Sequence, residues 1–389
     1  MKYHVGVFSY YYLPIVNGVT LTIADWMRHA KRSGIQSTIF IPNLGSDVYR
    51  GVADVVPYPA VPLYRRLGIT IPMFPETYVL REVLQRKIDL LHAHHPFYIG
   101  NLALTVKKQY KLPLVFTYHT RYSDYVASYM PALSPHMVQA LTIKFLLRFL
   151  NQCDAITVSN TALKYELVNN GVSAPLYVVP PGVETKRFAT ASRALGRKRL
   201  QIGSKEKILL YVGRLAKEKN IYFLMRAFSS IARKLPNTKC VFLGNGLEEA
   251  GLRAYAKKRG LANNVIFATK ETVQTVPDIY AAADMFVYAS QTETYGRVIV
   301  EAMATGLPVV ALAGPSIVDL LQDGITGRIV FKKSPHVFAA TVLELMKNPQ
   351  ERALLAAHAK KEAQTKYDSA ASWDELSQVY QTALAKYHG

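Results

Sequence analysis

The chain has 389 residues, and 50% of them are hydrophobic, which is enough apolar material for two packed cores. Its 47 Lys and Arg residues outnumber 27 Asp and Glu residues, which gives a net charge of +20 at pH 7. This composition excludes a fibrous or disordered protein, and the positive field attracts polyanions. The sequence has no zinc-finger spacing, RNP-like motif or basic zipper, so we expect an anionic membrane surface rather than nucleic acid as the partner.

The two cysteines, Cys153 and Cys240, are far apart and lack the spacing of metal ligands. A reducing compartment without disulfides fits this usage. The apolar run at the start of the sequence is too short for a signal peptide. Lys144 and Arg148 interrupt the best candidate for a transmembrane helix, residues 137–150. We therefore expect a cytoplasmic protein that lies peripherally on the inner face of the cell membrane.

Short buried strands alternate with helical patterns along the first half of the chain. The expected strands are residues 3–10, 37–42, 90–94, 114–118 and 155–159, and the expected helices are residues 21–33, 78–86, 102–110 and 137–152. The alternation restarts with strands at residues 207–213, 239–243, 265–268, 285–289 and 309–311. Strands that alternate with helices predict parallel, doubly wound sheets, so the fold class is α/β with two Rossmann-like domains and a cleft between them.

A Pro-Pro-Gly segment within residues 177–188 suits a connection between the two halves. We place the first domain at residues 1–185 and the second at 186–368, followed by a C-terminal segment, 369–389, with a helix at about 372–387. Ligands of open α/β sheets bind at the carboxyl ends of the strands, so functional residues are sought there.

Several polar motifs of the first half follow expected strands. Asn17-Gly18 forms a turn after the first strand, although Asn-Gly is also an ordinary turn sequence. His92, His94 and His95 suggest a metal site, but no cysteine or carboxylate cluster lies nearby to complete one. We therefore expect no metal.

Two aromatic or basic segments are candidates for the acceptor or for a membrane. Tyr122, Tyr125 and Tyr129 have helical spacing and form one stripe, which faces either the core or lipid. Residues 63–75 mix apolar side chains with Arg65 and Arg66. This loop either dips into an anionic bilayer or packs over the first domain.

Two cations follow the first strand of the second half. The strand ends at Gly213, Arg214 comes directly after it, and Lys219 follows before the next helix, 222–235. Two fixed cations at one point can neutralise a diphosphate, although a solvated basic turn has the same sequence pattern. Gly244 and Gly246 form a glycine turn after the next strand, where backbone could approach a nucleotide or where packing alone requires glycine.

Glu293 lies just before a turn at Gly296, and Glu301 lies inside a short helix expected at residues 298–305. The free N–H groups at the start of a helix suit a pyrophosphate, and carboxylates accept hydrogen bonds from paired sugar hydroxyls. The alternative is two solvated helix glutamates in an ordinary α/β protein. The cations at Arg214 and Lys219 favour a nucleotide-sugar site.

The Glu293-x7-Glu301 spacing, together with Gly213-Arg214 and Lys219, resembles the retaining glycosyltransferases of family 4, which have the GT-B fold. The resemblance covers nearly the whole chain. It implies that Arg214 and Lys219 neutralise the departing diphosphate, that Glu293 and His119 orient the hexose, and that Glu301 holds the ribose. It also implies that the terminal helix packs back on the first domain and that neither metal nor cofactor is needed.

The resemblance also assigns residues around the nucleotide-sugar. The residues between the glutamates cradle the diphosphate, the loop at Lys270 lies near the base, and Asn17 and Gly18 lie under the donor. The nucleotide-sugar residues are thus Asn17, Gly18, Gly213, Gly244, Lys270, Thr294, Tyr295, Gly296 and Glu301. The Tyr-His-Thr-x-Tyr-x-x-Tyr pattern around His119 is similar to bacterial 1,2-diacylglycerol 3-glucosyltransferases, which implies UDP-glucose as donor and diacylglycerol as acceptor.

One segment departs from the family pattern. Pro315-Ser316 replaces a usual Gly-Gly pair, and Asp319 stands where Glu is common. The donor sugar therefore stays open, and a GDP-mannose or other nucleotide-sugar transferase acting on a phosphoinositide or polyprenyl acceptor is an alternative. A nucleotide-sugar 2-epimerase is a second alternative, against which the paired glutamates and cations argue. A non-catalytic polyanion-binding protein is the third.

Overall fold

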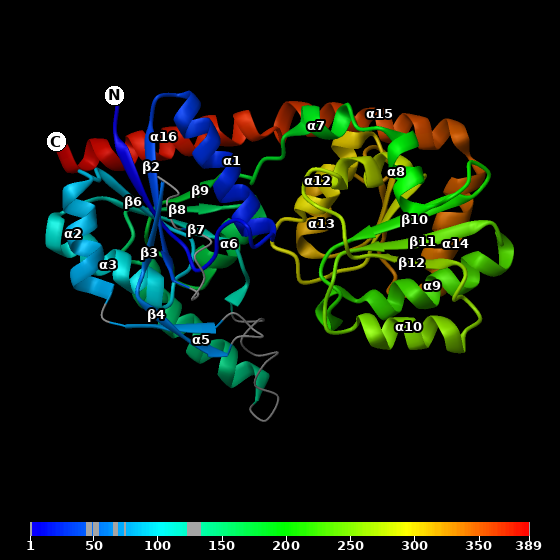
Figure 1. Cartoon of the computed structure of the whole chain (residues 1–389), viewed down its shortest axis with the longest axis horizontal. Coiled ribbons are helices and arrows are strands. Elements are labelled where there is room, and N and C mark those ends of the chain that lie inside the picture. Colours follow the sequence, from blue (N-terminus) through cyan, green and yellow to red (C-terminus); the bar gives the residue numbers. More distant parts are fainter. Residues whose placement is uncertain are drawn as a thin grey trace. The chain divides into compact units, whose positions relative to one another are not determined.

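The computed structural model describes residues 2–43, 49, 54–64, 69–73, 75–122 and 134–388, and it divides into two compact units (Figure 1). Unit 1 comprises Met1–Pro180 and Ser372–Gly389, and unit 2 comprises Pro181–Ala371. The last helix of the chain therefore belongs mainly to the first unit.

Unit 1 is built on a parallel sheet of seven strands within the described residues, in the order β3-β2-β1-β6-β7-β8-β9. These strands are β1 (His4–Phe8), β2 (Gln36–Pro42), β3 (Val55–Tyr58), β6 (Leu90–Ala93), β7 (Leu114–Tyr118), β8 (Ala155–Val158) and β9 (Leu176–Val178). The helices are α1 (Gly18–Arg32), α2 (Pro75–Gln85), α3 (Tyr98–Tyr110), α5 (Pro135–Leu150), α6 (Thr161–Asn169) and α16 (Ser369–His388). The strand order reverses between β1 and β6, which is the point where such sheets bind ligands.

Successive side chains of these strands enter two different cores, one on each face of the sheet. Val115 of β7 packs in the core that contains Trp26 and Leu376, whereas Phe116 packs in the other core with Phe149. Burial on both faces explains why the strands read as continuous apolar runs in the sequence.

The segment expected to be a loop at residues 63–75 is instead a two-stranded antiparallel hairpin, β4 (Ala60–Tyr64) and β5 (Ile69–Pro72), followed by α2 from Pro75. In β5, Ile69 and Ile71 alternate with Thr70, a period of two, whereas β4 is apolar throughout. The sequence analysis overlooked both strands because of their prolines. A two-stranded ribbon has only edge strands, which tolerate proline. Arg65 and Arg66 lie outside the described residues.

Unit 2 contains a second parallel sheet, six strands in its described part, in the order β12-β11-β10-β13-β14-β15. These strands are β10 (Lys207–Val212), β11 (Thr238–Leu243), β12 (Val265–Ala268), β13 (Met285–Tyr288), β14 (Val309–Leu312) and β15 (Arg328–Val330). The helices are α7 (Thr185–Ala189), α8 (Arg193–Leu200), the 3-10 helix η3 (Lys217–Lys219), α9 (Ile221–Lys234), α10 (Glu249–Lys258), α11 (Val276–Ala282), α12 (Arg297–Thr305), α13 (Pro315–Leu320), α14 (Pro335–Lys347) and α15 (Pro349–Lys366). Here the order reverses between β10 and β13.

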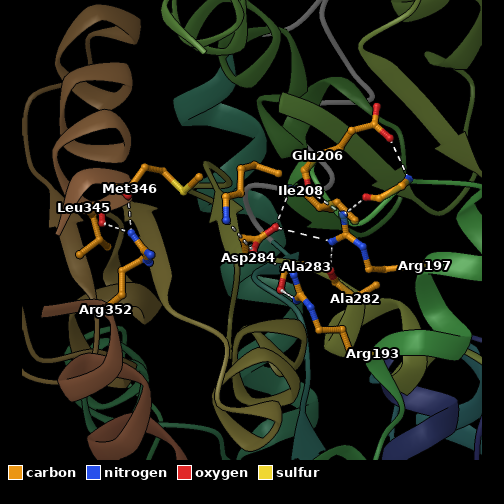
Figure 2. Close-up of polar contacts among 12 residues, drawn as sticks. Arg193, Arg197, Glu206, Ile208, Ala282, Ala283, Asp284, Leu345, Met346 and Arg352 are labelled. Carbon is orange, nitrogen blue, oxygen red and sulfur yellow. Dashed lines mark hydrogen bonds and ion pairs between the residues drawn. The ribbon is translucent and has the colours of Figure 1, made fainter. Parts of the chain in front are cut away.

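Part of the high positive charge is used inside unit 2, at the amino ends of its strands (Figure 2). Arg193 donates to the Ala283 carbonyl at 2.7 Å and pairs with Asp284 at 3.0 Å. Arg197 donates to the Ala282 carbonyl at 3.2 Å, and Asp284 accepts from the Ile208 backbone N–H at 2.9 Å. These arginines satisfy the carbonyls at the end of α11 and lock α8 to the sheet, so they are structural cations.

The expected fold class is confirmed: each unit is a doubly wound α/β sheet of the kind found in GT-B proteins. The main differences are strands that the pattern missed, β3, β9 and β15, which are short. None of the described helices is long and apolar enough to cross a membrane.

Candidate functional site

The strongest sequence motifs of unit 2 meet at the carboxyl edge of its sheet, beside the reversal between β10 and β13. Gly213 follows β10, Gly244 follows β11, and Glu293 lies in the loop after β13. Asn220 ties this loop to η3 and α9, because its side-chain amide donates to the Ala289 carbonyl at 3.2 Å. Residues that are far apart in the sequence thus form one site.

Two glycines allow the strand ends to approach closely. Gly213 and Gly244 have φ of +148° and +134°, which residues with a side chain rarely adopt. A Cβ at position 244 would lie 2.2 Å from the Gly213 carbonyl oxygen, a distance that the backbone could not keep. Gly213 requires glycine for its backbone conformation and Gly244 also for packing, and this packing fixes the turn that carries Arg214.

Lys219 and Glu293 form an ion pair at the centre of this edge. The Tyr288 hydroxyl donates to the same carboxylate oxygen of Glu293 at 2.5 Å. The side chains of Lys219 and Glu293 are each only 17% exposed, so water screens this pair weakly. The structure therefore brings together two of the predicted catalytic residues and adds a tyrosine that the sequence analysis did not select.

The surroundings of Glu293 favour its ionised form. Burial acts to raise the pKa of the carboxyl group, but the Lys219 charge and hydrogen bonds from Lys219, Tyr288 and Ser290 outweigh burial and hold the pKa below its usual value. An ionised carboxylate accepts hydrogen bonds only, which suits it to hydroxyl groups of a ligand.

The turn after Glu293 leads into α12 as expected. Gly296 is the N-cap of this helix, with φ of +89°, and α12 runs over Arg297–Thr305. Tyr295 is buried, and its ring packs edge-on against Tyr367 at 6.3 Å between ring centroids. Thr294 lies between Glu293 and Tyr295, in the turn that orients the first N–H groups of α12.

Glu301 lies inside α12 and is buried. Its carboxylate accepts from the Tyr280 hydroxyl at 2.8 Å and from Arg297 Nε at 3.2 Å. Burial raises the pKa of this carboxyl group, and the Arg297 charge and Tyr280 offset that effect only in part. Arg297 also donates to the Gly182 carbonyl at 2.8 Å, which ties α12 to the start of unit 2.

Arg214 and Lys270 are more solvated than the central pair. Arg214 pairs with Glu218 at 3.1 Å and is about half exposed, and the Tyr211 hydroxyl donates to its carbonyl at 3.1 Å. The Tyr211 ring stacks on Tyr288 at 5.9 Å, which links Arg214 to the Glu293 environment. Lys270 is exposed, just after β12.

In unit 1, Asn17 is the N-cap of α1. Its side chain accepts from the Thr20 N–H at 2.9 Å, and the Thr20 hydroxyl accepts from the Asn17 N–H at 3.0 Å. A capping box of this kind is a structural use of Asn17. Gly18 starts α1, and a Cβ there would meet no atom within 4 Å, so packing does not demand glycine at this position.

His119 follows β7 and belongs to a histidine cluster at the carboxyl edge of the unit 1 sheet. His119 Nε2 and His94 Nδ1 are 2.7 Å apart, and the rings of His94 and His92 have centroids 4.1 Å apart. Burial, together with the neighbouring histidines, lowers the pKa of His94 and His119 well below the usual value, so both rings are neutral. Two neutral rings share one proton in this bond, which gives His119 a hydrogen-bonding role rather than a cationic one.

The remaining acceptor candidates differ in outcome. Tyr122 is buried, with edge-on ring contacts to Phe97 at 5.3 Å and Tyr118 at 5.4 Å, so at this position the stripe faces the core. Tyr125 and Tyr129 lie outside the described residues, as do Arg65 and Arg66.

Sequence reasoning missed the residues that support the two glutamates, namely Tyr288, Tyr280 and Arg297. Arg297 could have been found, because it stands four residues before Glu301 in a helix, a spacing that brings opposite charges together. The tyrosines read only as apolar strand and helix residues. No group of three or more His, Cys, Asp or Glu side chains in the described part of the chain could hold a metal ion.

The chain is similar to known proteins over most of its length. Residues 16–187 match the family Glycosyltransferase Family 4, and residues 192–362 match Glycosyl transferases group 1. An alpha-monoglucosyldiacylglycerol synthase of Acholeplasma laidlawii is 27% identical over 359 residues, covering 89% of both chains. A protein of the same name from Streptococcus pneumoniae is 27% identical over 350 residues, covering 88% of this chain and 78% of its own.

Among solved structures, Anabaena Alr3699/HepE in complex with UDP-glucose superimposes with a TM-score of 0.80 at 18% identity, covering 97% of this chain and 99% of that one. This likeness shows the shared fold. The two family matches follow one another along the chain and correspond to the two sheets. The chain therefore belongs to the glycosyltransferases of GT-B fold, with a family 4 domain followed by a group 1 domain.

Proposed function

We propose that the protein is a retaining hexosyltransferase that moves glucose from UDP-glucose to diacylglycerol at a membrane surface. The observation that carries the proposal is the largely buried Lys219–Glu293 ion pair, which lies at the strand-order reversal of unit 2 and is followed by α12 with Glu301 inside it. A nucleotide diphospho-sugar needs positive charge for its diphosphate and acceptors for its hydroxyl groups. This edge offers a fixed cation and a helix N-terminus for the first and a carboxylate for the second.

On the donor side, Lys219 and Arg214 supply positive charge to the diphosphate, together with the N–H groups at the start of α12. The Glu293 carboxylate accepts hydrogen bonds from hexose hydroxyls. One oxygen of Glu301 accepts from Tyr280 and the other from Arg297, and both retain further acceptor capacity for ribose hydroxyls. Gly213 and Gly244 let backbone come close to the nucleotide, and Lys270 is placed to contact its base.

In the proposed reaction the bond between the hexose C1 and the β-phosphate oxygen breaks, and the acceptor hydroxyl oxygen bonds to C1 on the same face. The acceptor proton passes to the departing phosphate oxygen, so the products are the glycoside and UDP. His119 and Glu293 hold the hexose through hydrogen bonds. The cationic side chains perform the electrostatic task that a metal ion performs in other transferases, so turnover should survive a chelator.

The acceptor and donor are inferred from relatives. The two synthases named above are described as making a glucosyl-diacylglycerol, and the Anabaena protein is described in complex with UDP-glucose. These descriptions support a lipid acceptor and a UDP-sugar donor for this chain.

The test is to incubate purified protein with diacylglycerol in mixed micelles and a panel of UDP- and GDP-sugars. Product formation is followed by released nucleotide and by mass spectrometry of the lipid, and NMR of the product gives the anomeric configuration. Diacylglycerol-dependent turnover of UDP-glucose with an α-linked product is the expected result. Absence of nucleotide release with every donor would overturn the proposal.

Lys219→Ala and Glu293→Gln should each lower turnover about tenfold or more without unfolding the protein, because each removes a group that contacts the reacting donor. Lys217→Ala is the matched control, since Lys217 lies in the same 3-10 helix but its side chain is 84% exposed, against 17% for Lys219. We expect this control to stay within about twofold of wild type. Equal turnover in all variants would contradict the site assignment.

A further inference from the structure

Helix α5 (Pro135–Leu150) has an inner face that belongs to the core of unit 1. Val138, Leu146 and Phe149 are buried there, and Leu146 and Phe149 pack in the same core as Phe116. Residues spaced three or four apart in a helix share a face, so the residues between these positions point to solvent. That outer face is the unusual part of the helix.

The outer face of α5 carries large apolar side chains. Met137, Leu141 and Phe145 are 48%, 61% and 48% exposed, and they follow one another at intervals of four residues. A surface helix usually turns charged and polar residues toward solvent. Single exposed apolar residues are normal, but a row of three on one helix face indicates a contact surface.

The same face carries cations and no acid. Lys144 and Arg148 are exposed beside Leu141 and Phe145, and α5 contains no Asp or Glu at all. The apolar stems of Lys and Arg can lie along an apolar surface while their charged ends reach phosphate groups.

A bilayer surface fits these features better than a span does. The inner face of α5 is held in the core of unit 1, so the helix cannot leave the protein to cross a membrane. A helix with one apolar face flanked by Lys and Arg lies in the plane of the lipid headgroups. The hairpin region adds exposed apolar residues from another part of unit 1, Val61 and Met73.

We propose that the outer face of α5, formed by Met137, Leu141, Phe145, Lys144 and Arg148, docks the protein on an anionic lipid bilayer. This inference rests on the proposed function, because docking would bring unit 1 to a lipid acceptor. The negative headgroups complement the two cations, and the three apolar side chains enter the boundary between headgroups and acyl chains.

The test compares Met137→Glu/Leu141→Glu with wild type in sedimentation with phosphatidylcholine vesicles that contain or lack phosphatidylglycerol. Phe145 is left in place because its ring lies 5.9 Å from that of Phe97 and helps to hold the fold. The matched control is Leu354→Glu, since Leu354 lies on α15 of unit 2 and is 61% exposed, like Leu141. Circular dichroism and the melting temperature check that all variants fold.

We expect the α5 variant to bind anionic vesicles at least about tenfold more weakly and to lose turnover on diacylglycerol embedded in vesicles by a similar factor. Its turnover on a short-chain diacylglycerol dissolved as monomers should equal that of wild type. Leu354→Glu should match wild type in both assays. Equal vesicle binding by wild type and the α5 variant would overturn the inference. So would analytical ultracentrifugation in which wild type and Leu354→Glu are dimers and the α5 variant is a monomer.

The outcomes separate this inference from the proposed function. Vesicle binding that depends on α5 without any glycolipid product would reject the proposed reaction and support the docking face. If wild type and the α5 variant bind the vesicles equally and form glycolipid on them at the same rate, the reaction is supported and the docking face is rejected.

Discussion

The pKa values of Glu293 and Glu301 shift in opposite directions, although the two residues belong to one motif. The pKa of Glu293 is lowered despite burial because Lys219 and Tyr288 bind its ionised form. The pKa of Glu301 is raised, because burial outweighs the contribution of Arg297. Carboxyl groups whose pKa values are driven apart usually have different tasks. This difference agrees with the proposal that Glu293 serves the hexose and Glu301 the ribose.

Tyr288→Phe tests whether Tyr288 positions Glu293. The change removes one hydrogen bond to a carboxylate and leaves the ring in place, so the pKa of Glu293 should rise. An acid with a lowered pKa is ionised above that pKa, so the acidic limb of kcat/KM should move to higher pH. Because bonds to charged groups contribute about 1.5–3 kcal/mol, turnover near pH 7 should fall by about tenfold to 150-fold.

The matched control for this change is Tyr222→Phe. Tyr222 donates to Glu248 at 2.9 Å, so the control removes a tyrosine–glutamate bond of the same kind that lies outside the Glu293 environment. It should leave the pH profile where it is. An unshifted acidic limb in Tyr288→Phe would show that Tyr288 only fills space.

At the site, the sequence predicted Lys219 and Glu293 from motifs that follow strands, and the structure pairs these two side chains. It did not predict the Tyr288–Glu293 bond or the His94–His119 pair. The first depends on how the loop after β13 folds back over its strand. The second depends on the pairing of β6 with β7, which brings together two residues that are 25 positions apart in the sequence. Neither is encoded in a local pattern.

At the level of elements, the ends of strands determine the site. β10 and β11 pair from Lys207 opposite Thr238 to Val212 opposite Leu243, so Gly213 and Gly244 come next to one another by register. The glycine turn after β11 was predicted from sequence with packing left as one of two explanations. The geometry shows that the packing requirement exists, since the Cβ of any other residue at 244 would overlap the Gly213 carbonyl.

Gly244→Ala should therefore destabilise unit 2 and weaken donor binding, because the β10 turn that carries Arg214 must shift. Gly260→Ala is the control: Gly260 also has positive φ, +69°, but no atom lies within 4 Å of its Cβ position. Both variants carry backbone strain, and only Gly244→Ala adds overpacking, which costs about 1–3 kcal/mol. Denaturant unfolding measures the difference, and equal losses in the two variants would contradict the packing argument.

For the whole molecule, alternating strands and helices were sufficient to predict two doubly wound sheets. The period of hydrophobic residues is local, and the parallel topology follows from it by general rules. The packing of the last helix on the first sheet, in contrast, does not follow from a local sequence pattern. Tyr380 bonds to His92 at 2.6 Å across 288 positions of sequence, and burial lowers the pKa of His92 to about 3. Only the family resemblance implied that this helix returns to the first domain.

Helix α16 closes one core of unit 1 after the chain has passed through unit 2. Leu376 is fully buried there with Trp26 and Trp373, and Trp26 Nε1 donates to the Ser372 hydroxyl at 3.0 Å. Leu376→Ala should lower the free energy of unfolding of unit 1 by about 2–5 kcal/mol, the usual result of deleting a buried leucine side chain.

Tryptophan fluorescence reports this loss selectively, because the chain has 2 Trp residues and both lie in the core that α16 closes. The denaturation midpoint seen by fluorescence should fall in Leu376→Ala, while the circular dichroism change that belongs to unit 2 keeps its midpoint. Gln381→Ala, on the exposed side of the same helix, should shift neither midpoint. An unchanged fluorescence midpoint in Leu376→Ala would mean that unit 1 folds without α16, and the C-terminal helix would then be an attachment to a completed domain rather than part of its core.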